Sequence, residues 1–293
     1  IPHILDGLKP VQRRILHTLF TMDDGKFHKV ANIVGQTMAF HPHGDAAIYE
    51  ALVNLANKGF LLSRQGNFGN IFTGDPAAAA RYIEARLSPL AREALFNPNT
   101  TKTTPSYDGR NQEPICLPAK IPLLLMQGAE GIAVGMTTKV LSHNFIELLE
   151  AEIEILNDKE ITLLPDFPTG GILDASEYDK GRGKIKLRAR ITTPTEKTVV
   201  ITEICHGTST ESLIRSIDEA AKKGKIKIDR IDDYTAEKVE IEITLPRGHY
   251  AKDLIKKLYA FTQCEVTIHS QVTIIKDNKP YETDVEDILR TNV

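Results

Sequence analysis

The sequence has no tryptophan and only three cysteines among its 293 residues. Cys116, Cys205 and Cys264 are widely spaced, and no two of them stand at the short spacing of a metal-binding pair. A sparse, odd-numbered set of this kind is typical of a reducing compartment and disfavours a secreted scaffold that depends on disulfide bonds. We therefore expect a cytoplasmic protein.

Long hydrophobic runs are also missing. The candidate at residues 121–126 is far shorter than the roughly 18 residues that a membrane-spanning helix requires, so we expect no membrane span. Hydrophobic residues make up 41% of the chain and charged residues 26%, which disfavours a disordered chain. At 293 residues the chain exceeds the size at which one core usually splits into two. It opens at Ile1 without a methionine and closes on what looks like the start of a helix, so we expect a piece of a longer protein.

An excess of positive charge is lacking as well. The 36 Lys and Arg residues are set against 39 Asp and Glu, which gives a net charge of −3 and excludes a generally basic nucleic-acid-binding domain. Any contact with nucleic acid must come from a local patch. Residues 1–44 are the best place to look, because five of the nine histidines lie there.

Hydrophobic periodicity predicts a mixed α+β fold that begins with helices. Apolar residues recur at helical spacing over residues 9–20 and 29–40, and Asp45 is a good N-cap for a third helix. Pro42 ends the second helix, so the pair resembles a helix-turn-helix, and the glycine-rich residues 61–74 suggest a β-wing. A further helix is expected after Tyr82, through Leu95.

The second half reads as an α/β lobe. We expect two domains, residues 1–157 and residues 158–293, with the change of composition near residues 165–171 marking the boundary. The elements expected on either side of that change are helices at 143–157, 210–223 and 250–262 and strands at 184–191, 198–204, 225–231, 239–245 and 265–275.

Two short patterns carry candidate chemistry. The first is His41-Pro42-His43, which could be an exposed turn, a structural pair, part of a metal site, or a pair of phosphate donors at a helix N-terminus. A metal site is disfavoured because no further Cys or His stands nearby. The second is Arg81-Tyr82, where a guanidinium could assist a phenol as a nucleophile and stabilise negative charge on phosphorus.

Two glycine-rich patterns are weaker when taken alone. Residues 65–70 (QGNFGN) most simply form a hairpin turn. Residues 131–136 (GIAVGM) would ordinarily be a core strand, and the alternative is a loop that presents Ile132 as an apolar wedge between base steps of bent DNA.

Taken in order, these patterns closely resemble the A subunits of DNA gyrase and bacterial topoisomerase IV. The resemblance rests on residues 6–14 (DGLKPVQRR), 41–45 (HPHGD), 65–69 (QGNFG), 77–82 (AAAARY) and 131–136 (GIAVGM), and it continues at 166–171 (DFPTGG) and 181–184 (GRGK). It covers essentially the whole chain.

The resemblance implies a winged-helix DNA-cleavage domain followed by a tower domain. Tyr82 would form a transient 5′-phosphotyrosyl bond and Ile132 would insert into bent DNA. The residues that would surround the scissile phosphate are Arg81, Arg14, His41 and His43. Further expected DNA contacts are Lys9, Arg13, Lys29 and Asn67.

The resemblance also implies partners. These are double-stranded DNA, a second copy of the chain, and a B subunit that uses ATP and holds Mg²⁺ on its TOPRIM domain, in an A2B2 complex at the nucleoid. We expect no metal held by this chain itself, and we favour topoisomerase IV over gyrase. Two rival classes stay open at this point, a non-catalytic winged-helix DNA-binding or architectural protein and a structural homodimer that does not bind DNA.

One departure from the family generates a prediction. In many members a serine stands at the position of Ala46 and, with an acidic residue where Glu50 stands here, anchors the metal–water bridge of quinolones. Because a methyl group cannot hydrogen-bond that water, we expect weak fluoroquinolone inhibition, which Ala46→Ser strengthens. The measurement is drug stabilisation of the covalent cleavage complex, and an unchanged level in the serine variant would contradict the prediction.

Overall fold

The computed structural model describes residues 1–293, and these divide into two compact units. Unit 1 contains Ile1–Gly69, Pro76–Pro165 and Gln271–Val293, and unit 2 contains Asn70–Asp75 and Asp166–Ser270. The sequence-based division after residue 157 lies close to the main boundary but is wrong in two places. The chain returns to unit 1 after Ser270, and a short segment inside the first half belongs to unit 2.

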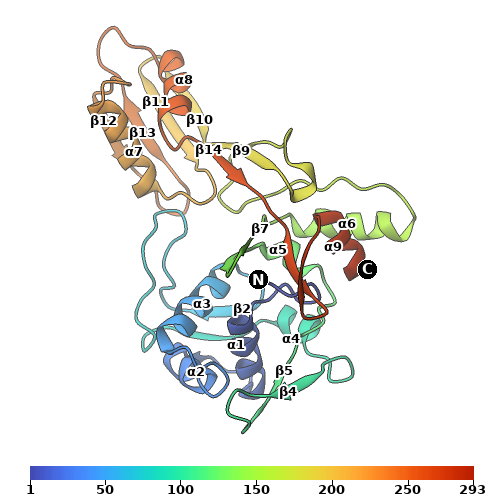
Figure 1. Ribbon diagram of the computed structural model, residues 1–293. Helices are drawn as coiled ribbons and strands as arrows, with labels where there is room; N and C mark the ends of the chain where they lie inside the picture. The colour runs from blue at the N-terminus through green and yellow to red at the C-terminus, as the bar shows by residue number, and fades with distance from the viewer. The chain divides into compact units, whose positions relative to one another are not determined.

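Three helices form the base of unit 1: α1 (Pro10–Thr21), α2 (Val30–Thr37) and α3 (Asp45–Asn57). They pack on one another, as the blue part of Figure 1 shows. Buried side chains such as Ile15, Ile33 and Leu52 form the core there. Pro10 suits the first turn of α1, and the Gln12 side chain accepts a hydrogen bond from the Lys9 N–H. The three predicted helices are therefore confirmed.

A small sheet, one helix and a hairpin follow these three helices in unit 1. The sheet has the order β1 (His28–Lys29), β3 (Glu84–Leu87), β2 (Leu62–Gln65), with antiparallel pairs. It is followed by α4 (Pro89–Leu95), which Ser88 caps, and by the hairpin of β4 (Thr103–Pro105) and β5 (Gln112–Pro114). Residues 84–87 were expected to begin a helix, and this was wrong, because they pair with β2 and bury Ala85 and Leu87.

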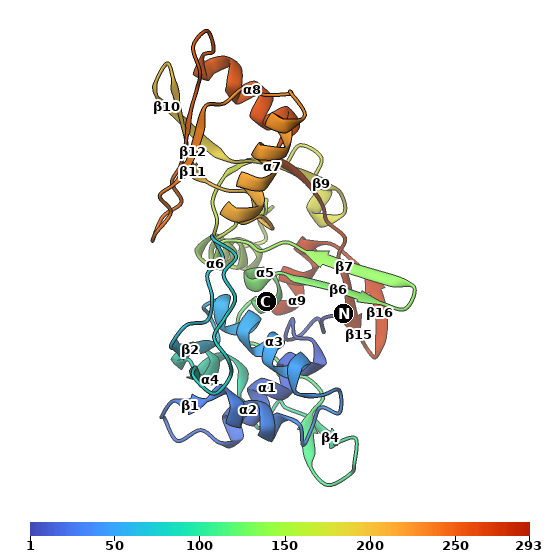
Figure 2. The same cartoon turned by 90° about the vertical axis from the view of Figure 1, so that its left-hand side faces the viewer.

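The rest of unit 1 surrounds a second hairpin. This hairpin consists of β6 (Ala129–Ala133) and β7 (Met136–Val140), and β15 (Thr273–Lys276) with β16 (Lys279–Glu282) lies beside it, as Figure 2 shows. The helices of this part are α5 (Leu123–Gln127), α6 (Phe145–Leu156) and α9 (Val285–Asn292). No helix of the chain combines the length and the apolarity needed to cross a bilayer.

Unit 2 is built on two antiparallel sheets. One has the order β10 (Arg190–Thr195), β11 (Thr198–Glu203), β13 (Ile241–Thr244), β12 (Arg230–Asp233), and the other has the order β14 (Glu265–His269), β9 (Lys184–Arg188), β8 (Ile172–Asp174). Helices α7 (Thr210–Lys222) and α8 (Ala251–Phe261) accompany them, and a short 3₁₀ turn, η1 (Asp179–Gly181), precedes β9. The mixed α+β class is confirmed, although the strand predicted at 225–231 begins only at Arg230.

Gly7 is a position where only glycine fits. Its φ is +64°, and a Cβ there would lie 2.5 Å from the Leu124 Cα. We predict that Gly7→Ala lowers the free energy of unfolding by about 2–5 kcal/mol, from left-handed backbone strain and steric overlap together. The measurement is chemical denaturation followed by circular dichroism.

Gly25→Ala is the matched control. Gly25 has a φ of +77°, but a Cβ added there would meet nothing within 4 Å, so it tests the backbone contribution alone and should cost only about 1–2 kcal/mol. Equal losses in the two variants would show that the contact with Leu124 has no part in the effect.

Candidate functional site

Tyr82 lies on a loop that two backbone hydrogen bonds attach to helix α2. The backbone N–H groups of Val30 and Ala31, at the start of α2, donate to the carbonyls of Ile83 (2.9 Å) and Ala80 (3.1 Å). Ile83 is fully buried beside them. The two residues between these anchor points, Arg81 and Tyr82, face solvent, and the Tyr82 side chain is 63% exposed. A helix N-terminus, which has unpaired N–H groups, thus fixes the loop that carries the expected nucleophile.

Arg81 lies directly against the tyrosine. Its guanidinium carbon is 4.5 Å from the centroid of the Tyr82 ring, a cation–π contact. Arg81 has no carboxylate partner, so its charge is not neutralised within the chain. The phenolic oxygen of Tyr82 makes no hydrogen bond to the protein either. An accessible phenol beside an unpaired cation can take part in nucleophilic chemistry on an anionic substrate.

A second group contains Arg14 and the two turn histidines. Arg14 Nη1 lies 3.0 Å from His41 Nδ1, and the His41 and His43 rings meet edge to face with centroids 5.0 Å apart. Burial, followed by the positive charges of Arg14 and His43, lowers the pKa of His41, and the carboxylate of Glu113 opposes this shift. His41 is buried and His43 is exposed. No hydrogen bond or ring contact joins this group to Tyr82 within the chain.

Glu113 belongs to this group, and no sequence motif indicated it. Its carboxylate holds Arg14 by two hydrogen bonds, Nε–Oε2 at 2.6 Å and Nη2–Oε1 at 3.0 Å. The two residues are 99 positions apart, and the glutamate stands on β5 in a hairpin of otherwise polar character. In the sequence Glu113 is one carboxylate among many, and its partner cannot be identified without the fold.

Ile132 lies on the β6–β7 hairpin and does not belong to the core. It is 87% exposed, and Val134 at the tip is 99% exposed, so the core-strand interpretation of residues 131–136 is wrong, and the exposed Ile132 lies on a strand where the alternative had a loop. The hairpin is held by Gln271, whose backbone pairs with Lys139 and whose side chain accepts from the Thr137 hydroxyl at 3.0 Å. Thr137 stands directly opposite Ile132 in the hairpin. The exposed aliphatic side chains of Ile132 and Val134, on a hairpin that Gln271 holds in place, are suited to insertion into an apolar environment.

The structure corrects the expectation for Arg13. Its side chain is buried, and its guanidinium donates to both oxygens of Asp6 at 2.7 and 3.0 Å. It is therefore a structural residue and is not available to a phosphate. Of the other expected contacts, Lys29 is exposed and paired with Glu84 at 2.8 Å, and Lys9 is half-buried.

Asn67 lies in the long connection between β2 and β3, so the hairpin turn expected at residues 65–70 is wrong. Its side-chain oxygen accepts from the Gly69 N–H at 2.8 Å, and its carbonyl accepts from the Ala78 N–H at 2.9 Å. Asn67 is exposed, but its carboxamide oxygen is already used in the hydrogen bond with Gly69.

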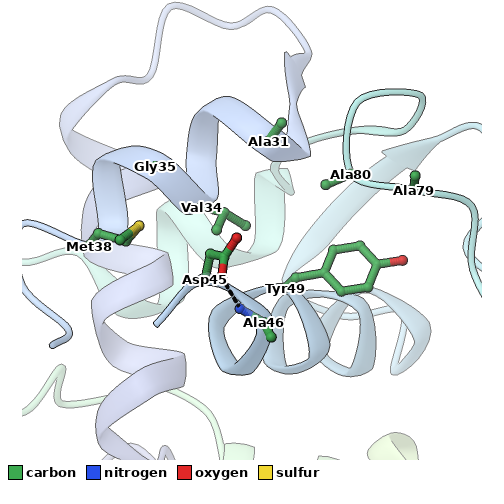
Figure 3. Close-up of a pocket in the computed structure, with 9 residues that line it drawn as sticks. All are labelled: Ala31, Val34, Gly35, Met38, Asp45, Ala46, Tyr49, Ala79 and Ala80. Atoms are coloured by element: carbon green, nitrogen blue, oxygen red, sulfur yellow. Dashed lines mark hydrogen bonds between the residues drawn. The ribbon is translucent and has the colours of Figure 1, made fainter. Parts of the chain in front are cut away.

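A pocket of about 420 Å³ opens between α2, α3 and the loop before Tyr82. Figure 3 shows the residues that line it, which are Ala31, Val34, Gly35, Met38, Asp45, Ala46, Tyr49, Ala79 and Ala80. Ala46 is among them, whereas Glu50 is exposed on the same helix and does not line the pocket. Asp45 was expected as the N-cap of this helix but is its first residue, after Gly44, and its carboxylate accepts from the Ala46 N–H at 2.9 Å.

Comparison with known proteins shows the family of the chain. The family that comprises the A subunits of DNA gyrase and topoisomerase IV matches residues 1–293. The chain belongs to this family. It is 54% identical to the A subunit of DNA topoisomerase 4 from Borreliella burgdorferi over 290 residues, which are 99% of this chain and 46% of that protein.

The A subunits of DNA gyrase are more distant relatives. The chain is 38% identical to the one from Mycobacterium tuberculosis, over 99% of this chain and 38% of that protein. It is 39% identical to the one from Thermotoga maritima, over 95% of this chain and 38% of that protein. The chain thus spans less than half the length of these relatives.

The buried Arg13 generates a stability prediction. Replacing it in Arg13→Met leaves the Asp6 carboxylate, which is 1% exposed, without its cation, and we expect the free energy of unfolding to fall by about 3–5 kcal/mol. The control is Arg92→Met, which removes a more exposed pair with Asp23 and should cost about 1 kcal/mol or less. Denaturant unfolding measures both. If Arg13→Met kept normal stability but showed a weaker salt dependence of DNA binding, Arg13 would be a DNA contact after all.

Proposed function

We propose that this chain is the DNA breakage-reunion region of a type IIA topoisomerase A subunit. The observation that carries the proposal is the anchored loop that exposes Tyr82 beside the unpaired charge of Arg81, in a chain that belongs to this family. Unit 1 would be the winged-helix cleavage domain and unit 2 the tower. The 54% identity to a topoisomerase IV protein, against 38% to a gyrase protein, favours topoisomerase IV.

The chemistry follows from the exposed phenol. The Tyr82 oxygen attacks a backbone phosphorus, a 5′-phosphotyrosyl bond forms, and the 3′-oxygen of the cut strand leaves and takes up a proton. The reverse attack by that hydroxyl restores the phosphodiester and frees the phenol, so no energy from outside is needed for sealing. Arg81 would stabilise the charge that accumulates on phosphorus. Arg14, His41 and His43 would contact the same phosphate, and Ile132 would enter a bent duplex.

The partners come with this proposal. A second copy of the chain would supply the second tyrosine for the opposite strand, and a B subunit would use ATP in an A2B2 complex. The chain has no group of three His, Cys, Asp or Glu side chains that could hold a metal ion. On the family resemblance, the Mg²⁺ of the complex would be held by the TOPRIM domain of the B subunit, and no metal-dependent step is derived from this chain.

Tyr82→Phe tests the proposal. In the full-length protein with its B partner, Mg²⁺ and plasmid DNA, this variant should lose the covalent adduct trapped by detergent while binding DNA normally, because only the nucleophilic oxygen is removed. The control Tyr107→Phe alters a tyrosine of similar exposure in the same unit, 58% against 63%, and should leave the adduct unchanged.

The rival classes give different results in the same assay. A non-catalytic DNA-binding protein yields no adduct from either the wild type or the variant. A structural homodimer shows no salt-dependent affinity for DNA at all. An adduct that persists in Tyr82→Phe would move the nucleophile to another residue.

A further inference from the structure

Glu113 controls how Arg14 is presented. The side chain of Glu113 is 10% exposed and that of Arg14 is 20% exposed. The carboxylate occupies Nε and Nη2, the two donors on one side of the guanidinium, in the paired geometry typical of Arg–carboxylate contacts. The third nitrogen, Nη1, is thereby directed to His41.

The contact between Arg14 and His41 determines which ring nitrogen carries the proton. A guanidinium can only donate, so His41 Nδ1, 3.0 Å from Nη1, must accept and be unprotonated. A neutral ring then carries its proton on Nε2. The lowered pKa of His41 agrees with a neutral ring. The Nε2–H has no hydrogen-bond partner within the chain and is available to an external acceptor.

Both ends of this link are fixed by the fold. Glu113 stands opposite Thr104 in the β4–β5 hairpin, and the neighbouring Gln112 carbonyl contacts the His17 ring at 3.2 Å. At the other end, the backbone N–H of His41 donates to the backbone carbonyl of Thr37 at 3.0 Å. Two successive residues of the hairpin, Gln112 and Glu113, thereby contact α1. Their partners His17 and Arg14 lie about one helical turn apart. Catalytic groups must be held in a precise geometry by supporting hydrogen bonds, and a fixed carboxylate that orients an arginine provides such support.

We propose that Glu113 is a positioning residue of the cleavage site, which holds Arg14 so that His41 keeps its Nε2–H for a phosphate oxygen. The phosphate in this statement rests on the proposed function, whereas the hold on His41 does not. The ion pair has a third member in His41, and the guanidinium stays partly exposed beside an imidazole donor that has no partner within the chain.

The test uses the full-length protein with its B partner and compares Glu113→Gln, which removes the charge and keeps the size, with Glu113→Asp, which keeps the charge. Single-turnover cleavage should fall roughly 10- to 100-fold in Glu113→Gln, with a smaller loss in Glu113→Asp, because a misplaced group costs rate. The Kd for DNA should change by less than about threefold. The matched control, Glu93→Gln, removes a solvent-exposed pair with Lys120 at 2.6 Å and should leave the rate unchanged.

A spectroscopic measurement separates positioning from support of the fold. Magic-angle-spinning ¹⁵N NMR of the full-length protein labelled at histidine, with His41 assigned by difference from His41→Gln, should show only the Nε2–H form in the wild type. Glu113→Gln should give a mixture of the two neutral forms, because Nδ1 loses its oriented donor.

The proposal is overturned if wild-type His41 carries its proton on Nδ1. It is equally overturned if Glu113→Gln loses cleavage and thermal stability together with an unchanged His41 spectrum, or leaves both rate and spectrum unchanged. If the wild type forms no adduct, the proposed function fails and the phosphate part of this proposal falls with it. A shifted His41 spectrum would in that case still establish that Glu113 holds the pair.

Discussion

The buried carboxylate of Asp6 is the interaction on which the site depends. It is 1% exposed and accepts four hydrogen bonds, two from Arg13 and one each from the backbone N–H groups of Leu8 and Leu117. One side chain thereby fixes the segment before α1, the orientation of α1 and the segment that follows β5. A carboxylate taken from water is tolerated only when its acceptor capacity is used in this way. The Arg14–Glu113 pair depends on it as well, because Arg14 follows Arg13 in α1 and Glu113 shortly precedes Leu117 in the chain.

The two consecutive arginines show what the sequence can and cannot predict. Both stand in a motif that the family resemblance identifies, and both were expected at the DNA. Successive helical residues point about 100° apart, so one of them meets the interior and the other meets the edge of the helix bundle. Which is which depends on where Asp6 and Glu113 lie, and those partners are 7 and 99 positions away. The motif predicts the residue types, and only the fold assigns their roles.

The same limit applies to the secondary structure. Helices α1, α2, α6, α7 and α8 could be predicted because each has an apolar face at helical spacing. Residues 84–87 could not, since Ala85 and Leu87 fit a helical pattern and a strand pattern equally well, and pairing with β2 decides. The return of the chain to unit 1 at Gln271 was missed because residues 265–275 were read together as strand, although β14 and β15 belong to different units.

Charge pairing explains how a chain of net charge −3 can still contain a site for an anion. Many of its arginines are matched by carboxylates, as Arg13, Arg92, Arg188 and Arg190 are. Arg81, next to Tyr82, has no such partner, and its charge meets an aromatic face. A cation that has no internal counter-ion gains more from an incoming phosphate than one that must first leave a carboxylate. A local site for an anion beside Tyr82 therefore does not require a basic domain.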